Sequence, residues 1–225
     1  MVKLTYIGHS AFIVSDGNNN IAIDPFITGN PNATIKATDI KPNFILLTHA
    51  HDDHIGDTIE LAKSNDATVI AVNELAIYLG TKGLKSHPLL IGGEFQFPFG
   101  SVKLTIAHHS SANAEGAYMG PACGCIINIG GKKIYHAGDT GLFLDMKLIG
   151  EISKPDVMLA PIGNNYTMGI DDAVKAVEFV NPKLAIPMHY NTFPIIQADP
   201  NDFVTKVKKN NSDARVMNFG ETIEI

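Results

Sequence analysis

The feature that most constrains this chain is a cluster of three histidines and two aspartates within six residues. It occupies residues 49–54 and has the sequence HAHDDH. The apolar run 44–47 before it is typical of a buried strand, and residues 55–63 after it have helical periodicity. Imidazole nitrogens and carboxylate oxygens are ligands for Zn²⁺, Mn²⁺ and iron. The sequence therefore predicts a strand, a tight connection and a helix that together gather metal ligands at one point.

A solvated polar turn is the alternative interpretation of this cluster. Turns are rich in Asn, Gly, Asp and Ser because of backbone conformation and local hydrogen bonding. Those reasons do not apply to histidine. Three histidines in so short a stretch favour metal binding over an ordinary turn.

The length of the chain and the regular recurrence of its aliphatic segments predict a single domain over residues 1–225. At this length roughly 70% of the unfolded chain's surface can be buried. Aliphatic segments recur at short intervals, and no Pro/Ser-rich or low-complexity linker interrupts them. No apolar span of 18 residues occurs, so no membrane helix is expected.

Several weaker signals bear on the compartment and the partners. The N-terminus enters a strand pattern at once, without a signal-peptide pattern, and Cys123 and Cys125 are expected to be reduced core residues. Both signals predict a cytoplasmic protein. The formal net charge of −6 counts against a nucleic-acid surface, which usually needs a basic stripe.

Apolar periodicity predicts strands and helices along the whole chain. Helices are expected at 55–63, at 74–82 with Asn73 as the cap, around 142–149, at 170–180, and in a last helix that Asp199 and Pro200 begin. Strands are expected at 2–7, 10–15, 21–24, 43–48, 68–72, 102–106, 123–129, 132–136, 157–160, 184–186, 214–217 and 222–225. Such a pattern favours a mixed α/β (α+β) fold, and two similar halves packed sheet on sheet would give a four-layer sandwich.

Further ligand-type residues come at or just after predicted strand ends: Asp24, His109, Asp139 and His189. Each alone could be an ordinary turn or strand-end residue. Loops at strand ends are where an α/β scaffold collects its site. The joint placement therefore predicts one site built from distant parts of the chain.

On these residues the chain resembles the metallo-β-lactamase superfamily. The family's motifs match in order at Asp24, at 49–54, at His109, at Asp139 and at His189. The chain also resembles a branch of small metal-dependent hydrolases related to the ascorbate-6-phosphate lactonases. It shares with this branch the short motifs Gly-His-Ser, His-Ser-Ser, His-Ala-Gly-Asp-Thr and Thr-Met-Gly. The resemblance implies an αββα sandwich and a binuclear, metal-dependent hydrolase.

The resemblance also implies two ligand sets. One metal would bind His49, His51 and His109; the other would bind Asp53, His54 and His189; Asp139 would bridge them, and Asp24 would orient a ligand histidine from behind. The neighbouring His108 is the alternative to His109, which is chosen because it begins His-Ser-Ser. Since His51 stands where diiron relatives have Glu, Zn²⁺ is favoured for both ions, with Mn²⁺ as the alternative.

The reaction that the resemblance implies is hydrolysis of an ester, lactone or phosphoester bond of a small molecule by a metal-bridging hydroxide. Asp53 would orient the hydroxide, and His9 is the candidate proton donor to the leaving group. Asn165 and Tyr166 precede the helix at 170 and are expected to contact substrate. The N-terminus of that helix would favour an anionic substrate.

Two other functions compete with this one. A phosphodiesterase or nuclease acting on nucleic acid is disfavoured by the acidic charge, and a non-catalytic metal-binding scaffold is disfavoured by the full ligand set. The related lactonases assemble, so a homo-oligomer is compatible with the resemblance.

Overall fold

The computed structural model describes residues 1–225, and its strands form two sheets of seven and six strands. The first sheet has the order β13-β1-β2-β3-β4-β5-β6, and the second has the order β12-β11-β10-β9-β8-β7. The strands of the first sheet are β1 (Lys3–Gly8), β2 (Ala11–Ser15), β3 (Asn20–Ile23), β4 (Phe44–Leu46), β5 (Thr68–Val72), β6 (Ser86–Leu89) and β13 (Thr222–Glu224). Those of the second are β7 (Glu94–Phe97), β8 (Gly100–Ile106), β9 (Cys123–Ile129), β10 (Lys132–His136), β11 (Val157–Pro161) and β12 (Leu184–Met188).

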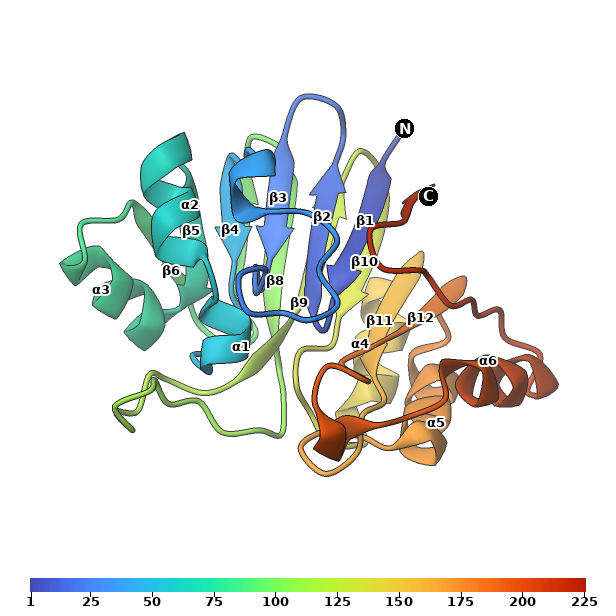
Figure 1. Cartoon of the computed structure of the whole chain (residues 1–225). Coiled ribbons are helices and arrows are strands. Elements are labelled where there is room, and N and C mark those ends of the chain that lie inside the picture. Colours follow the sequence, from blue (N-terminus) through green and yellow to red (C-terminus); the bar gives the residue numbers. More distant parts are fainter.

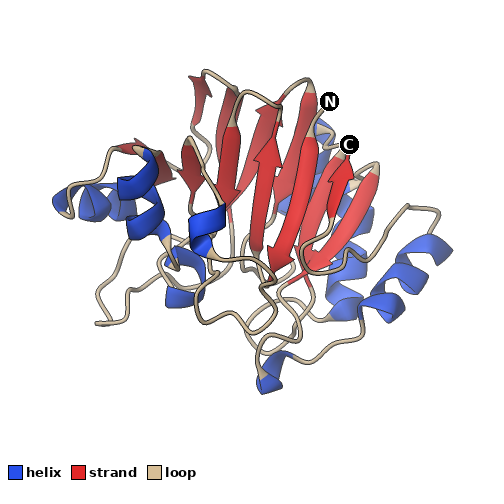
Figure 2. Ribbon diagram, turned by 45° about the horizontal axis from the view of Figure 1, so that its top comes forward, coloured by secondary structure: helices blue, strands red, loops and turns tan.

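The helices lie on the outer sides of the two sheets (Figures 1 and 2). They are α1 (Asp52–Ile55), α2 (Thr58–Asn65), α3 (Asn73–Thr81), α4 (Asp145–Ser153), α5 (Ile170–Val180) and α6 (Pro200–Lys209), with short 3₁₀ helices η1 (Ala37–Asp39) and η2 (Pro194–Ile196). α2 and α3 pack against the first sheet, and α4, α5 and α6 share a core with the second. The four layers confirm the predicted αββα sandwich. None of these helices has the length and apolar composition needed to cross a membrane.

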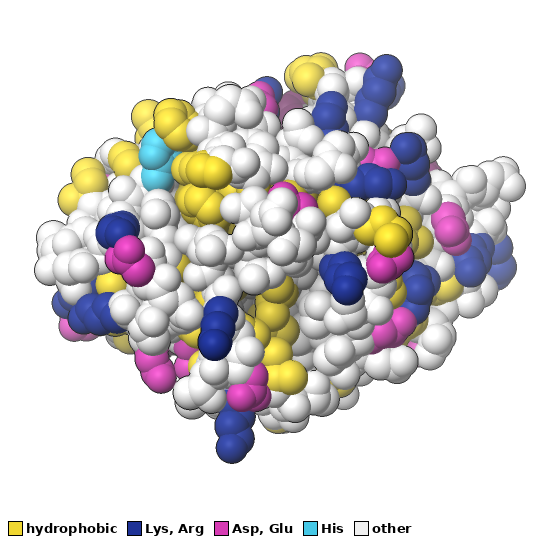
Figure 3. Space-filling view, turned by 90° about the horizontal axis from the view of Figure 1, so that it is seen from above, with side chains coloured by type: hydrophobic (Ala, Val, Ile, Leu, Met, Phe, Trp, Pro, Cys, Tyr) yellow, Lys and Arg dark blue, Asp and Glu magenta, His cyan; other side chains and the backbone are white.

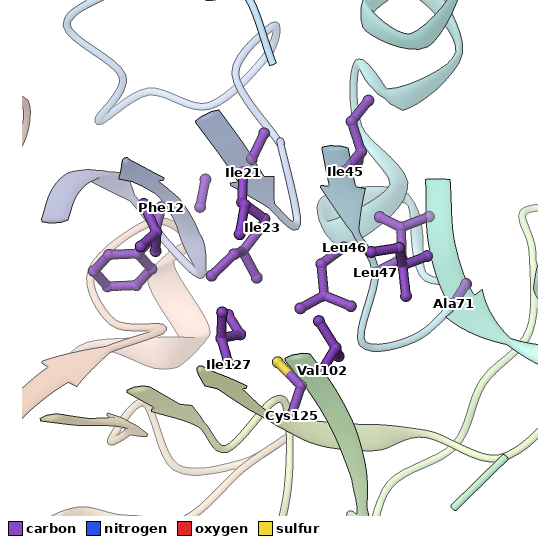
Figure 4. Packing of buried hydrophobic residues seen from close by; sticks show 14 of the residues in the cluster. Phe12, Ile21, Ile23, Ile45, Leu46, Leu47, Ala71, Val102, Cys125 and Ile127 are labelled. Carbon is purple, nitrogen blue, oxygen red and sulfur yellow. The ribbon is translucent and has the colours of Figure 1, made fainter. Parts of the chain in front are cut away.

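The largest core fills the space between the two sheets. In Figure 4, Ile23 and Leu46 of the first sheet face Val102 and Ile127 of the second. All four side chains are completely buried, and at about 25 cal/mol per Å² of apolar surface this packing is the main force joining the sheets. Cys125 lies in the same layer, and both cysteines are buried and free, as predicted.

Parallel pairing places several strand ends at the same edge. β3, β4 and β5 run parallel in the first sheet, and β10, β11 and β12 run parallel in the second. The two edges are tied together by backbone hydrogen bonds, from Cys123 N to Thr48 O at 3.0 Å and from His189 N to His9 O at 2.8 Å. Loops from both halves of the chain therefore meet there.

The predicted helix at 55–63 is confirmed only from Thr58 onward, as α2, because a break at Gly56 separates it from α1. Gly56 ends α1 with a φ of 42°, and a Cβ on it would lie 2.4 Å from the carbonyl oxygen of Pro25. The Asp57 carboxylate then accepts hydrogen bonds from the amides of Ile27 (2.9 Å) and Thr28 (2.8 Å). The break docks the segment after β4 onto the segment after β3.

Two smaller predictions are wrong. Asn73 is the first residue of α3, and the cap position belongs to Val72. The expected strand at 214–217 is absent, because only Ala214 pairs, in an isolated bridge with Ala185.

One acidic side chain ties three strands of the second sheet together. Asp156, just before β11, accepts a hydrogen bond from Lys133 N at 2.8 Å and another from Lys183 Nζ at 2.7 Å. Burial by itself would raise the pKa of this carboxyl, but the two donors outweigh it and lower the pKa below its ordinary value.

Candidate metal centre

The predicted ligands, and the predicted supporting residue Asp24, all follow strand ends at this shared edge. Asp24 follows β3, the 49–54 cluster follows β4, His109 follows β8, Asp139 follows β10 and His189 follows β12. α1, which carries Asp53 and His54, lies at the lower end of the sheets in Figure 1. His9, Asp24 and His189 have positive φ angles, and such backbone strain persists only where the surroundings fix it. The fold thus collects the predicted set from segments up to 165 residues apart (24 to 189).

Three imidazoles form the first group of ligand atoms. His51 Nδ1 lies 2.9 Å from His49 Nε2 and 3.3 Å from His109 Nε2. Nitrogens about 2.05 Å from a tetrahedral Zn²⁺ would be roughly 3.3 Å apart. The three side chains are therefore placed as ligands of one ion would be.

The second group contains Asp53, His54, His189 and also His9, and the ligand atoms of these four residues all lie within 4.8 Å of one another. Asp139 lies between the groups. Its Oδ2 is 3.0 Å from His189 Nε2, 3.4 Å from His54 Nε2 and 3.7 Å from His109 Nε2. One carboxylate oxygen thus faces imidazoles of both groups.

Asp24 and Thr48 determine which ring nitrogens point into the site. Asp24 Oδ2 accepts hydrogen bonds from Thr48 Oγ1 at 2.6 Å and from His54 Nδ1 at 2.7 Å. Since the Thr48 hydroxyl donates to Asp24, it accepts from His49 Nδ1 at 3.0 Å. The network therefore assigns the protons to both Nδ1 atoms and leaves the Nε2 lone pairs of His49 and His54 free for a metal ion.

The charges and unpartnered atoms of the site fit a divalent cation. His54 Nε2 and Asp139 Oδ1 are buried without a hydrogen-bond partner, which is costly unless a cation accepts their electron pairs. Burial alone would lower the pKa of His54, but the carboxylates of Asp139 and Asp24 raise it well above its ordinary value. The two carboxylates that favour a proton on His54 also favour a metal cation at the same position. Burial, helped by the neighbouring His54, lowers the pKa of His49, so that ring is neutral and can act as a ligand.

The structure separates the two adjacent histidines of the third motif. His109 faces the other ligands, whereas the His108 ring stacks on Phe143 with centroids 4.8 Å apart and an interplanar angle of 27°. This placement agrees with the choice of His109.

His9 lies behind Asp53, completely buried, and does not line the pocket in front of the ligands. Its Nε2 is 3.1 Å from Asp53 Oδ2, and its Nδ1 is 2.9 Å from Thr192 Oγ1. Burial lowers the pKa of His9 to about 4. A neutral ring with its proton on Nε2 donates to Asp53 and accepts from the Thr192 hydroxyl, so both nitrogens are engaged.

A pocket of about 500 Å³ opens in front of the ligands. Tyr166 lines it, as predicted, but Asn165 does not. The lining residues are His51, Asp53, His109, Ser110, Asp139, Tyr166, His189, Phe193 and Ile195. Asn164 and Asn165 both have positive φ angles, and this tight turn leaves Tyr166 on the pocket wall.

Sequence reasoning missed Thr48, Thr192, Phe193 and Ile195. Thr48 directly precedes the cluster and could have been suspected from that position. The roles of the other three depend on contacts that no local pattern signals; Thr192, for example, meets His9 across 183 residues.

Comparison with known proteins gives a consistent result. The family model described as "Beta-lactamase superfamily domain" matches residues 3–189. A metal-dependent hydrolase from Anoxybacillus flavithermus is 51% identical over 228 residues, with 100% of both chains covered. The metal-dependent hydrolase YtkL from Bacillus subtilis is 50% identical over 229 residues, also with 100% of both covered. Among solved structures, Igni18, a metallo hydrolase from the archaeon Ignicoccus hospitalis, superposes with a TM-score of 0.92 at 43% identity, covering 100% of this chain and 99% of its own.

Proposed function

This chain belongs to the metallo-β-lactamase superfamily and is a metal-dependent hydrolase of that family, and from this premise we propose that it uses two divalent metal ions to hydrolyse an ester, lactone or phosphoester bond in a small molecule. The observation that carries the proposal is the position of Asp139 Oδ2 within 3.7 Å of His109 Nε2 and 3.0 Å of His189 Nε2. A carboxylate shared in this way can hold two cations a few ångströms apart, as binuclear hydrolases require.

Each ion has its own set of side chains in this proposal. His49, His51 and His109 would hold one, Asp53, His54 and His189 would hold the other, and Asp139 would be shared between them. Five imidazoles and no thiolate favour Zn²⁺, with Mn²⁺ as the alternative. When bound, the ions lower the pKa of a water molecule and polarise the oxygen of the bond to be cleaved.

The chain's own groups guide the proton. Asp53 is 29% exposed toward the pocket, and its Oδ2 is held by His9 Nε2 at 3.1 Å. We assign Asp53 to orient the attacking water, take up its proton and return it to the leaving group. His9 then positions Asp53 and does not reach the leaving group itself, because it is enclosed behind that carboxylate.

The size of the pocket supports a small-molecule substrate, since binding sites for such ligands usually measure about 300–1,000 Å³. No Lys or Arg lines the pocket, and at the opposite end of the molecule, seen from above in Figure 3, Lys and Arg side chains are scattered among Asp and Glu without a continuous stripe. Both observations favour a small molecule over nucleic acid. The likeness to the ascorbate-6-phosphate lactonase branch, the cytoplasmic location and the homo-oligomer stay predictions.

The test begins with protein stripped of metal and reloaded with Zn²⁺ or Mn²⁺. We expect about two ions per chain and metal-dependent turnover of at least one compound among p-nitrophenyl esters, lactones and bis(p-nitrophenyl) phosphate. Asp53→Ala should lower kcat at least about 100-fold. Asp52→Ala is the matched control, because the Asp52 carboxylate is next to Asp53 in the sequence but is exposed and lies outside the pocket. Clearly fewer than two ions per chain after loading, or wild-type turnover by Asp53→Ala, would refute the proposal.

A further inference from the structure

We propose that the part of the substrate that reaches away from the metal ions is apolar and uncharged, and that it lies on a wall formed by Tyr166, Phe193 and Ile195. This inference rests on the proposed function, because it concerns the same pocket. It specifies the substrate class: a neutral ester or lactone with an alkyl, aryl or long acyl group, as opposed to a phosphorylated compound.

The pocket has two chemically different sides. The candidate metal ligands and Ser110 form the polar side, and Tyr166, Phe193 and Ile195 form the other. No Lys or Arg lines the pocket. Proteins that recognise a phosphate or carboxylate substituent usually supply an Arg fork, a Lys or a row of backbone amides for it. A charged substituent beyond the metal ions would therefore meet no counter-charge.

The apolar wall is open to solvent in the protein alone. Tyr166 is 53% exposed and Ile195 is 56% exposed, whereas the adjacent Ile196 is fully buried in the core. Exposed apolar side chains gathered beside a polar centre are typical of binding sites. An apolar group of the substrate would remove this surface from water, at about 25 cal/mol per Å².

The wall is also preformed. Pro194 begins η2, whose Ile196 amide donates to Phe193 O at 3.1 Å, and the Asn191 amide donates to Ile196 O at 2.9 Å. The Phe193 ring packs beside Phe26, with centroids 6.4 Å apart and an interplanar angle of 29°. A binding surface that is already ordered loses little conformational entropy when a ligand binds.

The expectation of an anionic substrate depended on the N-terminus of the helix at 170. In the structure that end of α5 borders a different hollow, together with Gln197 and Asp202. Its first turn already carries Asp171 and Asp172, and Lys206 pairs with Asp171 at 2.8 Å. The helix end therefore offers the metal pocket no positive field, and the apolar wall is the feature that remains to select the substrate.

The test uses zinc-loaded protein and straight-chain carboxylates as product analogues: acetate, butanoate, hexanoate and octanoate, each measured by calorimetry or as a competitive inhibitor. Affinity should rise roughly three- to fourfold for each methylene that reaches the wall. Ile195→Ala and Phe193→Ala should flatten this series and leave acetate binding unchanged. Ile77→Ala, which truncates a 58% exposed side chain on α3, is the control and should keep the full series.

A matched pair of ligands tests the charge preference. Butanoate should bind more tightly than succinate, which has the same metal-binding carboxylate but a tail that ends in a second carboxylate. Affinity independent of chain length, or tighter binding of the charged tail, would overturn the inference and leave the hydrolase proposal standing. Protein that fails to load zinc or to hydrolyse any compound would overturn the hydrolase proposal itself.

Discussion

Asp24→Asn is expected to weaken metal binding strongly while keeping the shape of the side chain. Asp24 is completely buried, and its carboxylate only accepts hydrogen bonds. Its Oδ1 accepts from Thr48 N at 2.8 Å, and its Oδ2 accepts from Thr48 Oγ1 at 2.6 Å and from His54 Nδ1 at 2.7 Å. An asparagine has one acceptor oxygen and one NH₂ donor, so one side of it must face a donor.

Either orientation of the new amide is costly. With its NH₂ toward Thr48 N, two donors oppose each other in a buried place, which costs about 1–3 kcal/mol of stability. With its NH₂ toward His54, the ring must accept on Nδ1 and carry its proton on Nε2, where the metal needs a lone pair. The Thr48 hydroxyl would then turn toward His49 and impose the same wrong tautomer there. Loss of such supporting contacts typically lowers metal affinity about 10- to 100-fold.

The assay is a zinc titration of metal-free protein against a chromophoric chelator, which resolves the two binding steps. Asp24→Asn should weaken both steps, and Thr48→Val should weaken only the step that involves His49. Asp57→Asn removes another buried carboxylate that accepts two amide hydrogen bonds nearby, without contact to a histidine, and should leave both steps unchanged. Wild-type zinc affinity in Asp24→Asn would refute the argument that this carboxylate sets the tautomers.

Three other predictions concern the same framework. His109→Ala should abolish binding of one of two zinc ions in the titration, and His108→Ala should not, because its ring stacks away from the site. Gly56→Ala should cost about 3–5 kcal/mol of unfolding free energy, since its Cβ would overlap backbone atoms 2.4–2.8 Å away. Gly83→Ala changes a residue that also has a positive φ, of 81°, but has nothing within 4 Å, and it should cost only about 1 kcal/mol; equal losses would refute the packing argument. Asp156→Asn should lower stability at neutral pH. Because the folded pKa of Asp156 is depressed, its contribution is present above the unfolded value of about 3.9 and is lost as pH falls through the folded value, so chemical denaturation of variant and wild type should converge in acid.

Strand ends and the metal motif could be predicted from the sequence because their signals are local. A buried strand reads as an apolar run, and imidazoles that follow it must lie at its end. The break at Gly56 could not be predicted, because Ile55, Ile59 and Ala62 continue one helical stripe across it. Its cause is the carbonyl oxygen of Pro25, a contact with another loop.

The same limit applies within the site. Ligand types and spacing identified which side chains could hold metal, and the structure brings these side chains together. The choice between His108 and His109 depended on which of two adjacent residues turns inward, and at a strand end periodicity does not decide that. The wall made by Phe193 and Ile195 gave no signal at all, since an apolar residue in a loop looks the same whether it faces the core or a pocket.

The cluster at 49–54 is therefore not a self-contained metal site. The segment before it supplies Asp24, which fixes the tautomers of His54 and, through Thr48, of His49. The second half of the chain supplies Asp139, which lies between the two ligand groups. It also supplies the loops after β11 and β12, which line the pocket. In the proposed site, the connections after β3 and β4 orient the ligand histidines, whereas Tyr166, Phe193 and Ile195 would contact the substrate. Substitutions of Tyr166, Phe193 or Ile195 should alter which substrate is accepted and leave metal affinity as it is, because none of the tautomer-setting hydrogen bonds passes through these three side chains.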